Sequence, residues 1–380
     1  MKEYIRDIES EIITRLFDPG KIIVLYGPRQ VGKTTLAKKI LSAFESQAGY
    51  FNCEERPVAD VLMSHNSNTM HSYFSGTPVI VLDEAQTVEN IGRALKILID
   101  AHPELNIIAT GSSSFDLANK INEPLTGRHF EFFLYPLSFH EIAVTDGNRA
   151  LIDLLETRMI YGCYPEIVSA ANEHDARTKL MSLSTSYLFR DIFKFKGVRN
   201  PTALSNLLRA LAYQVGNEVS QNELAGLVGI DGKTVASYLR LLEQAFIIFP
   251  LGSFSKNLRN EIKHGKKYYF YDNGVMSALT GDFRLPSSGR DMGALWENLM
   301  ISERLKHNQR QQSYKQLYFW RMHNSGELDL IEESDGALEP YEFKWRKTRS
   351  SKTSNRFVET YQTAAVKVVN RENFLEFLNI

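Results

Sequence analysis

Residues 27–34 combine two glycines, a lysine and a threonine at the spacing of a phosphate-binding P-loop, G-x-x-x-x-G-K-[ST]. Glycine lets the backbone turn tightly, so that successive N–H groups point at phosphate oxygens. In such a loop Lys33 reaches the β- and γ-phosphates, and the Thr34 hydroxyl ligates Mg²⁺. We therefore predict that a nucleoside triphosphate binds here with Mg²⁺, through Gly27, Pro28, Arg29, Gln30, Val31, Gly32, Lys33, Thr34 and Thr35.

Two carboxylates, Asp83 and Glu84, follow a second apolar run, Val79 to Leu82. A strand that ends in Asp83 can place this carboxylate in the Mg²⁺ shell, opposite Thr34. Glu84 can polarise the attacking water as a general base. An isolated Asp-Glu pair after a strand is more often a helix N-cap, but the P-loop roughly 50 residues upstream favours the catalytic interpretation.

A third polar position follows the apolar run Leu105 to Ala109. A polar side chain at the end of this strand can contact the γ-phosphate and hold the attacking water, and the candidates are Thr110 and Ser112. The alternative is a Gly-Ser turn that caps the next helix.

A second set of charged residues lies near the C-terminus. Asp329 lies on one predicted strand, and Glu342 and Lys344 lie on the next. Residues 342 and 344 share a face of their strand because side chains alternate along it. Asp329 and Glu342 can then bind one metal ion, with Lys344 beside a water or a phosphate and Glu297 as an extra acid from the preceding helix. The set resembles the PD-(D/E)xK nuclease core; the alternative is a buried ion-pair network in a silent relative.

The elements that must position these residues follow from periodicity. Strand-like runs at 21–26, 50–53, 78–84 and 105–110 alternate with helical segments, which predicts a doubly wound parallel α/β sheet with nucleotide at the carboxyl ends of its strands. Residues 140–200 have no strand pattern and predict a helical lid. We expect four domains: the ATPase core at 1–139, the lid at 140–200, a winged helix at 201–285 and a small α/β nuclease-like domain at 286–380.

The winged-helix prediction rests on three helical segments, a Gly turn and two strands between 201 and 271. The third helix would present basic and polar residues to a DNA major groove, and a basic wing would follow it; a protein-binding module is the alternative. The helix residues are Lys233, Thr234, Ser237 and Arg240, and the wing residues are Lys256, Arg259, Lys263, His264, Lys266 and Lys267.

Composition sets limits on function. A chain of 380 residues is long enough for two or three ordinary domains, and its net charge of −1 means that any nucleic-acid surface is local. Cys53 and Cys163 lie far apart and form no metal-spacing motif, which fits a reducing compartment. The N-terminus has no apolar core, and no run approaches the length of a membrane span. We expect a cytoplasmic protein.

The motifs together resemble the prokaryotic AAA-type P-loop ATPases. The resemblance rests on residues 27–36, on 125–128 followed by 135–139, and on 161–166, where Cys163 replaces a more usual Gly. It covers nearly the whole chain and implies that ATP and ADP are the nucleotides. It also implies that Arg128 can reach the γ-phosphate of a neighbouring subunit as an arginine finger, which requires a homo-oligomer; a surface arginine or an in-chain sensor is the alternative.

The predicted function is therefore a Mg²⁺-dependent ATPase that acts as a nucleotide switch, with double-stranded DNA as the candidate partner. The alternative is a regulatory ATP-binding module with a protein partner and a silent nuclease-like domain. No membrane partner is expected.

Overall fold

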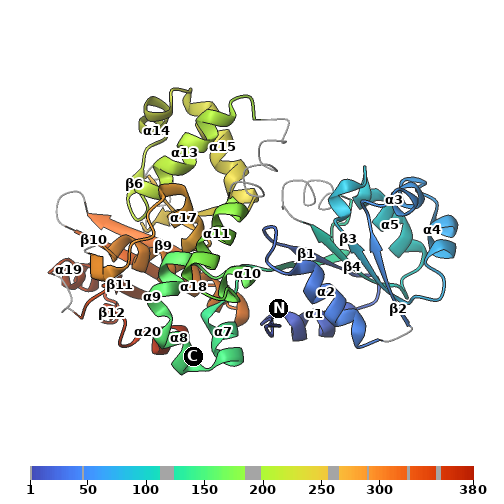
Figure 1. The fold of residues 1–380 in the computed structure, drawn as a ribbon, viewed down its shortest axis with the longest axis horizontal. Helices are drawn as coiled ribbons and strands as arrows, with labels where there is room; N and C mark the ends of the chain where they lie inside the picture. The colour runs from blue at the N-terminus through green and yellow to red at the C-terminus, as the bar shows by residue number, and fades with distance from the viewer. Residues whose placement is uncertain are drawn as a thin grey trace. The chain divides into compact units, whose positions relative to one another are not determined.

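The structure, a computed structural model, describes residues 2–44, 47–111, 124–184, 198–255, 265–288, 291–322, 326–347 and 352–380. Its residues form two units (Figure 1). The N-terminal unit comprises Ile5–Pro136 and Gln244–Phe246. The C-terminal unit comprises Met1–Tyr4, Leu137–Glu243 and Ile247–Ile380.

The N-terminal unit is built on a parallel sheet of five strands in the order β2-β3-β4-β1-β5. Every residue of β1 and β3 is buried, as expected for apolar runs inside a parallel sheet. The predicted parallel α/β sheet is confirmed. The strands are β1 (Ile22–Tyr26), β2 (Ala48–Asn52), β3 (Val79–Asp83), β4 (Asn106–Gly111) and β5 (His129–Phe133).

The strand order explains how helices cover this sheet. The chain leaves β1 in one direction to reach the edge strand β2, and then returns through β3 to β4. Right-handed crossovers in opposite directions put α2 on one face and the later helices on the other. Consistently, α1 contacts α2, whereas α3 and α4 contact α5. The helices are α1 (Glu9–Leu16), α2 (Lys33–Ser42), α3 (Arg56–Met63), α4 (Ser67–Tyr73) and α5 (Ile91–Ala101), with a short η2 (Ala85–Thr87) after β3.

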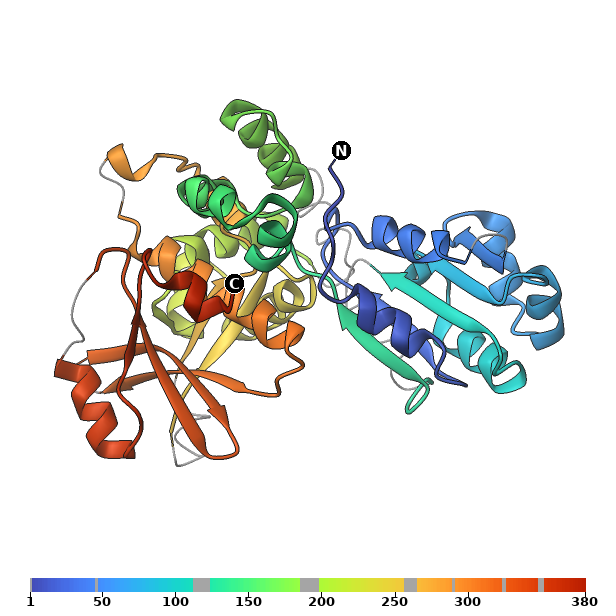
Figure 2. The same ribbon diagram turned by 90° about the horizontal axis from the view of Figure 1, so that it is seen from below.

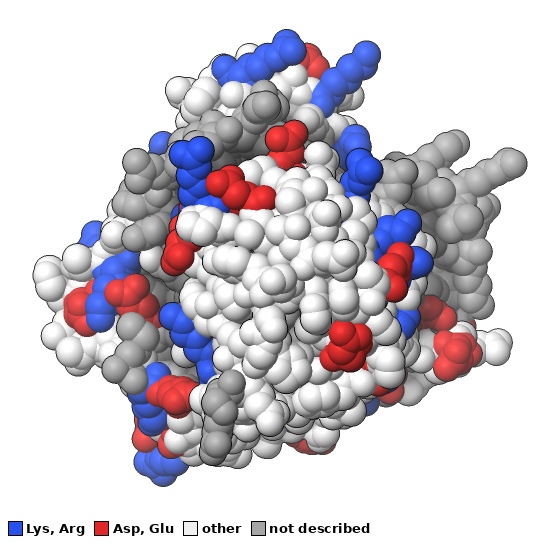
Figure 3. Space-filling view, turned by 90° about the vertical axis from the view of Figure 1, so that its right-hand side faces the viewer, with Lys and Arg blue, Asp and Glu red and all other residues white. Residues whose placement is uncertain are grey.

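The exposed edge of the N-terminal unit carries few charges. The sequence from Val61 to Leu82 contains no Asp, Glu, Lys or Arg. Figure 3 views the side that lies at the right of Figure 1, and the centre of that face has neither basic nor acidic side chains. A DNA backbone is bound by clustered Lys and Arg, and the described residues at the centre of this face present no such cluster.

The first part of the C-terminal unit is helical. In the described residues from 137 to 184 the structure contains α7 (Phe139–Asp146), α8 (Asn148–Asp153), α9 (Leu155–Tyr161), α10 (Pro165–Val168) and α11 (Glu173–Ser182). Helix α7 starts with a capping box, in which Ser138 accepts a hydrogen bond from the Glu141 N–H and Glu141 accepts one from the Ser138 N–H.

Asp272 joins this helical part to a segment more than 100 residues later in the chain. Its buried carboxylate accepts hydrogen bonds from the N–H of Cys163 (2.6 Å) and of Gly274 (2.8 Å), and it caps α17 (Asn273–Thr280). Gly162 has φ +78°, and a Cβ there would lie 2.0 Å from the Asp272 Oδ1. Only glycine therefore fits at position 162. The bond to Cys163 uses its backbone N–H, whereas the Cys163 side chain is buried in the core.

The second part of the C-terminal unit contains a sheet of seven strands in the order β12-β11-β10-β9-β7-β8-β6. Strand β7 runs parallel to β9, with Gly252 opposite Tyr318 and Ser253 opposite Phe319. The segments predicted as a winged helix and as a nuclease-like domain thus share one sheet. The strands are β6 (Glu218–Val219), β7 (Ile248–Ser253), β8 (Lys266–Phe270), β9 (Gln316–Met322), β10 (Gly326–Ser334), β11 (Ala337–Phe343) and β12 (Lys367–Val369).

Helices flank this sheet along its length (Figure 2). Helix α19 packs against it through Phe357, which forms a buried cluster with Trp320, Leu328 and Ile331. The remaining elements are α13 (Pro201–Tyr213), α14 (Gln221–Val228), α15 (Gly232–Gln244), η4 (Pro286–Ser288), α18 (Gly293–Arg310), α19 (Lys352–Tyr361) and α20 (Phe374–Leu378).

The predicted basic wing needs a correction. Lys266 is exposed, but Lys267 is completely buried and forms ion pairs with Glu297 and Glu327, so it cannot meet DNA. A buried ammonium needs such partners, and they come from elements far away in the sequence. The other predicted wing residues, Lys256, Arg259, Lys263 and His264, lie outside the described residues.

Candidate nucleotide site and C-terminal acidic cluster

The P-loop connects the buried end of β1 to the start of α2. Gly27 is required because a Cβ there would lie 2.2 Å from the Leu134 carbonyl oxygen, and Gly32 has a left-handed φ of +99°. The Lys33 ammonium is buried and donates hydrogen bonds to the Gly27 and Pro28 carbonyls, at 2.9 Å each. The loop therefore holds its lysine folded back over its own backbone, where a phosphate can replace the two carbonyls as acceptor.

Asp83, at the end of β3, accepts hydrogen bonds from three hydroxyl groups. Thr34 donates to its Oδ2 at 2.9 Å, Tyr50 donates to the same oxygen, and Thr110 donates to Oδ1. Two predictions meet here, because Thr34 comes from the P-loop and Thr110 from the end of β4. Tyr50 is absent from the predicted set. It lies in the middle of β2, opposite Val81 and two residues before the position opposite Asp83, and no local motif marks it.

Glu84 has a left-handed backbone, with φ 54° and ψ 40°, which is uncommon for a residue other than glycine. Its N–H donates a hydrogen bond of 3.1 Å to the Thr110 hydroxyl, and its carboxylate accepts one from the Gln86 side-chain amide. Thr110 therefore contacts both predicted acids, Asp83 through its carboxylate and Glu84 through its backbone. This backbone conformation turns Glu84 out of the direction of β3, directly after Asp83, the residue that accepts the hydrogen bond from Thr34.

Arg6 supports the P-loop from a segment with no motif. Arg6 is 7% exposed, and its guanidinium donates hydrogen bonds of 2.6 Å to the carbonyl oxygens of Val31 and Tyr135. These carbonyls belong to the P-loop and to the chain that follows β5. Arg6 thus holds the two segments in a fixed relation, and the local sequence around it carries no signal for this role.

Two predicted residues lie apart from this cluster or outside the structure. Arg128 forms an ion pair of 2.6 Å with Asp100, and its side chain is 38% exposed. Its predicted action on a neighbouring subunit stays a prediction. Ser112 lies outside the described residues.

Three carboxylates gather in the C-terminal unit: Glu297 from α18, and Glu327 and Asp329 from β10. Their ligand oxygens lie within 4.8 Å of one another. Burial and the charge of Glu297 raise the pKa of Asp329 to about 7. The pairing of β10 with β9 shifts register between Leu328 and Ile331, so the ladder is irregular at Asp329. Glu327 was missed, although it lies two residues before Asp329 and shares its strand face.

Glu342 and Lys344 extend the predicted set. The Lys344 ammonium lies 3.1 Å from the Glu342 carboxylate, and the Phe343 N–H between them donates a hydrogen bond of 2.7 Å to Asp329. The structure therefore brings Asp329 next to the Glu342–Lys344 segment and next to Glu297, as the nuclease-like prediction requires. Whether Asp329 and Glu342 share a metal ion stays a prediction.

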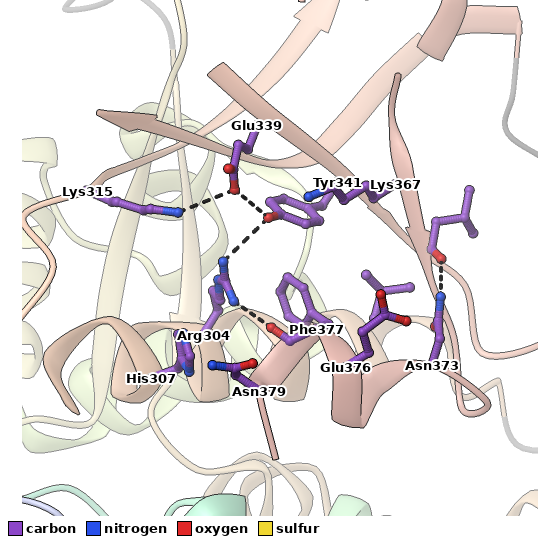
Figure 4. A pocket seen from close by; sticks show the side chains of 12 residues that line it. Arg304, His307, Lys315, Glu339, Tyr341, Lys367, Asn373, Glu376, Phe377 and Asn379 are labelled. Carbon is purple, nitrogen blue, oxygen red and sulfur yellow. Dashed lines mark hydrogen bonds and ion pairs between the residues drawn. The ribbon is translucent and has the colours of Figure 1, made fainter. Parts of the chain in front are cut away.

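A cavity of about 570 Å³ is lined by residues of α18, β11, β12 and α20, and several of these residues pair with one another (Figure 4). Lys315 contacts Glu339 at 3.3 Å, and the Tyr341 hydroxyl donates to Glu339 at 2.8 Å. Behind them, Arg304 binds the buried carboxylate of Glu332 through two hydrogen bonds of 2.7 Å. Most of the charged side chains that line this cavity are paired with other side chains of the protein. The cavity therefore presents no group of like charges that could bind one ligand of opposite charge.

One more potential metal group exists among the described residues, formed by His71, His102 and Glu104. The two imidazole rings stack at 3.9 Å with an angle of 10° between their planes. A metal ion must lie in the plane of each ligating ring, and it cannot lie in two parallel planes at once. The observed arrangement is a ring stack beside a carboxylate.

Among the described residues, no helix combines the length and the apolar character needed to cross a bilayer.

Comparison with known protein families divides the chain into three parts. Residues 19–143 match a family described as an AAA domain. Residues 152–285 and 292–377 match two domains of unknown function, DUF8612 and DUF4143. The chain therefore contains an AAA-type P-loop ATPase domain followed by two domains of unknown function.

The relatives that are similar in sequence are uncharacterized, and a solved structure resembles this chain in fold alone. The chain is 29% identical over 348 residues to an uncharacterized protein of Mycobacterium tuberculosis. The aligned region covers 90% of this chain and 74% of that protein. The chain is 27% identical over 317 residues to an uncharacterized protein of Methanocaldococcus jannaschii, covering 78% and 68%. A solved Walker-type ATPase of Pyrococcus abyssi is similar with a TM-score of 0.51 and 18% identity, over 73% of this chain and 96% of that chain.

Proposed function

We propose that this chain is a Mg²⁺-dependent ATPase that acts as a nucleotide switch, with DNA as the partner of its C-terminal unit. The observation that carries the ATPase assignment is the 2.9 Å hydrogen bond between Thr34 and Asp83. Thr34 comes from the first turn of α2 and Asp83 from the end of β3, so two separate motifs meet here, and a Mg²⁺ ion bound to the phosphates needs both of them.

Each residue has a defined role in this proposal. Lys33 releases the Gly27 and Pro28 carbonyls and binds the β- and γ-phosphates. Thr34 and Asp83 hold the Mg²⁺ ion, which neutralises phosphate charge. Glu84 orients and deprotonates the attacking water, and Thr110 fixes the backbone of Glu84 and the carboxylate of Asp83 together.

Two substitutions test the ATPase assignment. Lys33→Ala is expected to abolish nucleotide binding, measured by calorimetry, because the phosphates lose their buried cation. Glu84→Gln is expected to bind ATP with Mg²⁺ but to lose turnover. Lys96→Ala, a lysine on α5, serves as the matched control. Normal ATP turnover in purified Glu84→Gln would rule out Glu84 as the base.

A winged helix and a DNA partner complete the proposal. The order α13, β6, α14, α15, β7, β8 supports a winged helix. Lys233, Ser237 and Arg240 are exposed on α15, on one side of the helix that would enter a major groove. A gel-shift with duplex DNA at fixed salt, with and without ATP, tests this. Weaker binding by Lys233→Ala with Arg240→Ala is expected, and no shift at low salt favours a protein partner.

Homo-oligomer formation is part of the same proposal. The exposed Arg128 guanidinium can exchange Asp100 for the phosphate of a neighbouring subunit. Light scattering with and without ATP tests the oligomer. Loss of ATP turnover in Arg128→Ala, with nucleotide binding kept, is the expected result.

A second candidate concerns the C-terminal unit, where we propose a nuclease-like centre that is catalytically silent. The observation that favours silence is the buried Lys267, which already contacts two of the three clustered carboxylates. Incubation with DNA and Mg²⁺ or Mn²⁺ tests it. Equal products from wild type, Asp329→Ala and Lys344→Ala are expected, whereas cleavage that depends on both residues would show an active nuclease.

A further inference from the structure

A lysine side chain occupies the acidic cluster of the C-terminal unit. Lys267 comes from β8 and its side chain is completely buried. Its ammonium forms a hydrogen-bonded ion pair with Glu327 and lies 3.5 Å from the Glu297 Oε1. It also lies 5.2 Å from the centre of the Phe319 ring, on whose face a cation is attracted.

The carboxylates around this ammonium already have partners of their own. The Tyr269 hydroxyl donates a hydrogen bond of 2.7 Å to the Glu297 Oε1. The Asp329 Oδ2 accepts the Phe343 N–H at 2.7 Å. A divalent ion such as Mg²⁺ needs about six oxygen ligands near 2.1 Å, so it would have to displace these donors as well as the ammonium.

Electrostatics point the same way. Burial would by itself lower the pKa of Lys267, but Glu297 and Glu327 raise it above its ordinary value, so the side chain is charged. A second cation in contact with Glu297 and Glu327 would lie a few ångströms from the ammonium. Repulsion between cations at that separation is strong inside a protein, where water screens little.

We infer that the Lys267 ammonium is the resident cation of the Glu297–Glu327–Asp329 cluster and that it excludes a divalent metal ion from this site. The inference rests on the proposed silent centre, and it explains that silence. Because β8, α18 and β10 each supply a charged group, the cluster is an ionic bond that joins three elements. Removing the ammonium should turn it into a metal site.

Mn²⁺ binding to the full chain without nucleotide, followed by electron paramagnetic resonance, tests the inference. Wild type and Asp329→Asn are expected to bind Mn²⁺ equally. Lys267→Met keeps roughly the length of the side chain and removes its charge. It is expected to bind one Mn²⁺ ion more than wild type, at a concentration about tenfold or more below any at which wild type binds Mn²⁺ in this cluster. Lys266→Met, the adjacent exposed lysine, is the matched control and should behave as wild type.

Folding of the variant is followed separately. Thermal unfolding should show that Mn²⁺ stabilises Lys267→Met and leaves wild type unchanged, because the ion replaces the lost ammonium. If Lys267→Met does not fold, the comparison of wild type with Asp329→Asn decides. A Mn²⁺ ion that wild type binds and Asp329→Asn does not would overturn the inference, as would a folded Lys267→Met that gains none. Since no ATP is present, these outcomes are independent of the ATPase assignment.

Discussion

Asp83 shows how a single carboxylate can organise a nucleotide site. Its two oxygens accept three hydroxyl donors, from Thr34, Tyr50 and Thr110, which come from the P-loop, β2 and β4. Neutral donors orient a carboxylate without cancelling its negative charge. A metal ion needs that charge on its ligand. Tyr50 donates from β2, the edge strand that pairs with β3.

Tyr50→Phe is therefore expected to lower the ATPase kcat about tenfold, because the carboxylate loses one of its orienting donors. ATP binding should persist, since Lys33 is untouched. Steady-state turnover across a Mg²⁺ titration measures the effect, and the variant should need more Mg²⁺. Tyr73→Phe, an exposed tyrosine on α4, is the control. An unchanged Mg²⁺ dependence in Tyr50→Phe would contradict the role given to its hydroxyl.

The buried pair Glu332–Arg304 makes stability depend on pH. Burial alone would raise the pKa of Glu332, but hydrogen bonds from Arg304 and Asn308 lower it to about 2. The folded state thus holds fewer protons than the unfolded state near pH 3. The stabilisation is complete above the ordinary pKa of glutamate and is lost as the pH falls toward 2.

Comparison of wild type with Glu332→Gln isolates this effect. The difference in their free energies of unfolding is expected to shrink by roughly 2 kcal/mol between pH 6 and pH 3. Urea unfolding at both pH values measures it. A difference that stays constant would mean that the carboxylate is not held ionised by Arg304.

The residues that sequence could identify are those with a local pattern. Lys33, Thr34 and Asp83 stand in motifs whose chemistry fixes their spacing. Arg6 and Lys267 have no such pattern, because their partners lie far away in the chain. A lysine next to another lysine indicates a solvated surface, and only Glu297 and Glu327 reverse that reading for Lys267.

At the scale of elements, α18 connects several parts of the C-terminal unit. Its Asn298 side chain bonds the N–H and the carbonyl of Phe270 at the end of β8, at 2.7 and 3.0 Å, and the side chain of Asn273 at 2.8 Å. Further along, Glu303 accepts a hydrogen bond of 2.7 Å from the Phe139 N–H at the start of α7. One helix therefore holds β8, α17 and α7 in register.

Asn298→Ala should destabilise the C-terminal unit by about 2 to 4 kcal/mol, since it leaves two buried backbone groups of Phe270 without partners. Chemical denaturation measures this cost. Asn222→Ala, at an exposed position on α14, should change stability little. Equal stability of the two variants would show that water replaces the Asn298 amide.

Most elements could be predicted from periodicity, but their pairing could not. The apolar spacing of residues 221–228 predicts a helix with the bounds that the structure has, whereas the amphipathic pattern of residues 4–17 predicts a helix of which the structure forms only Glu9–Leu16. The parallel pairing of β7 with β9 joins residues about 65 positions apart, and no local pattern encodes such a contact. For that reason the sequence indicates two modules where the structure has one sheet.

At the scale of the whole molecule, the division into two units predicts two unfolding steps. Calorimetry of the full chain should resolve two thermal transitions, and ATP with Mg²⁺ should raise only that of the N-terminal unit, by roughly 3 to 6 °C. Lys33→Ala should lose this shift. A single transition that moves as one with ATP would show that the units unfold together.

The fit between Gly162 and Asp272 has a consequence for how this chain can change over evolutionary time. No side chain can be accommodated at 162 while a carboxylate occupies 272, and the loss of that carboxylate would leave the Cys163 N–H without its acceptor. We therefore expect that neither residue is replaced by another amino acid unless the other changes as well. The two residues, 110 positions apart, are expected to be inherited or lost as a pair, which makes them a single unit of selection within two separate stretches of sequence.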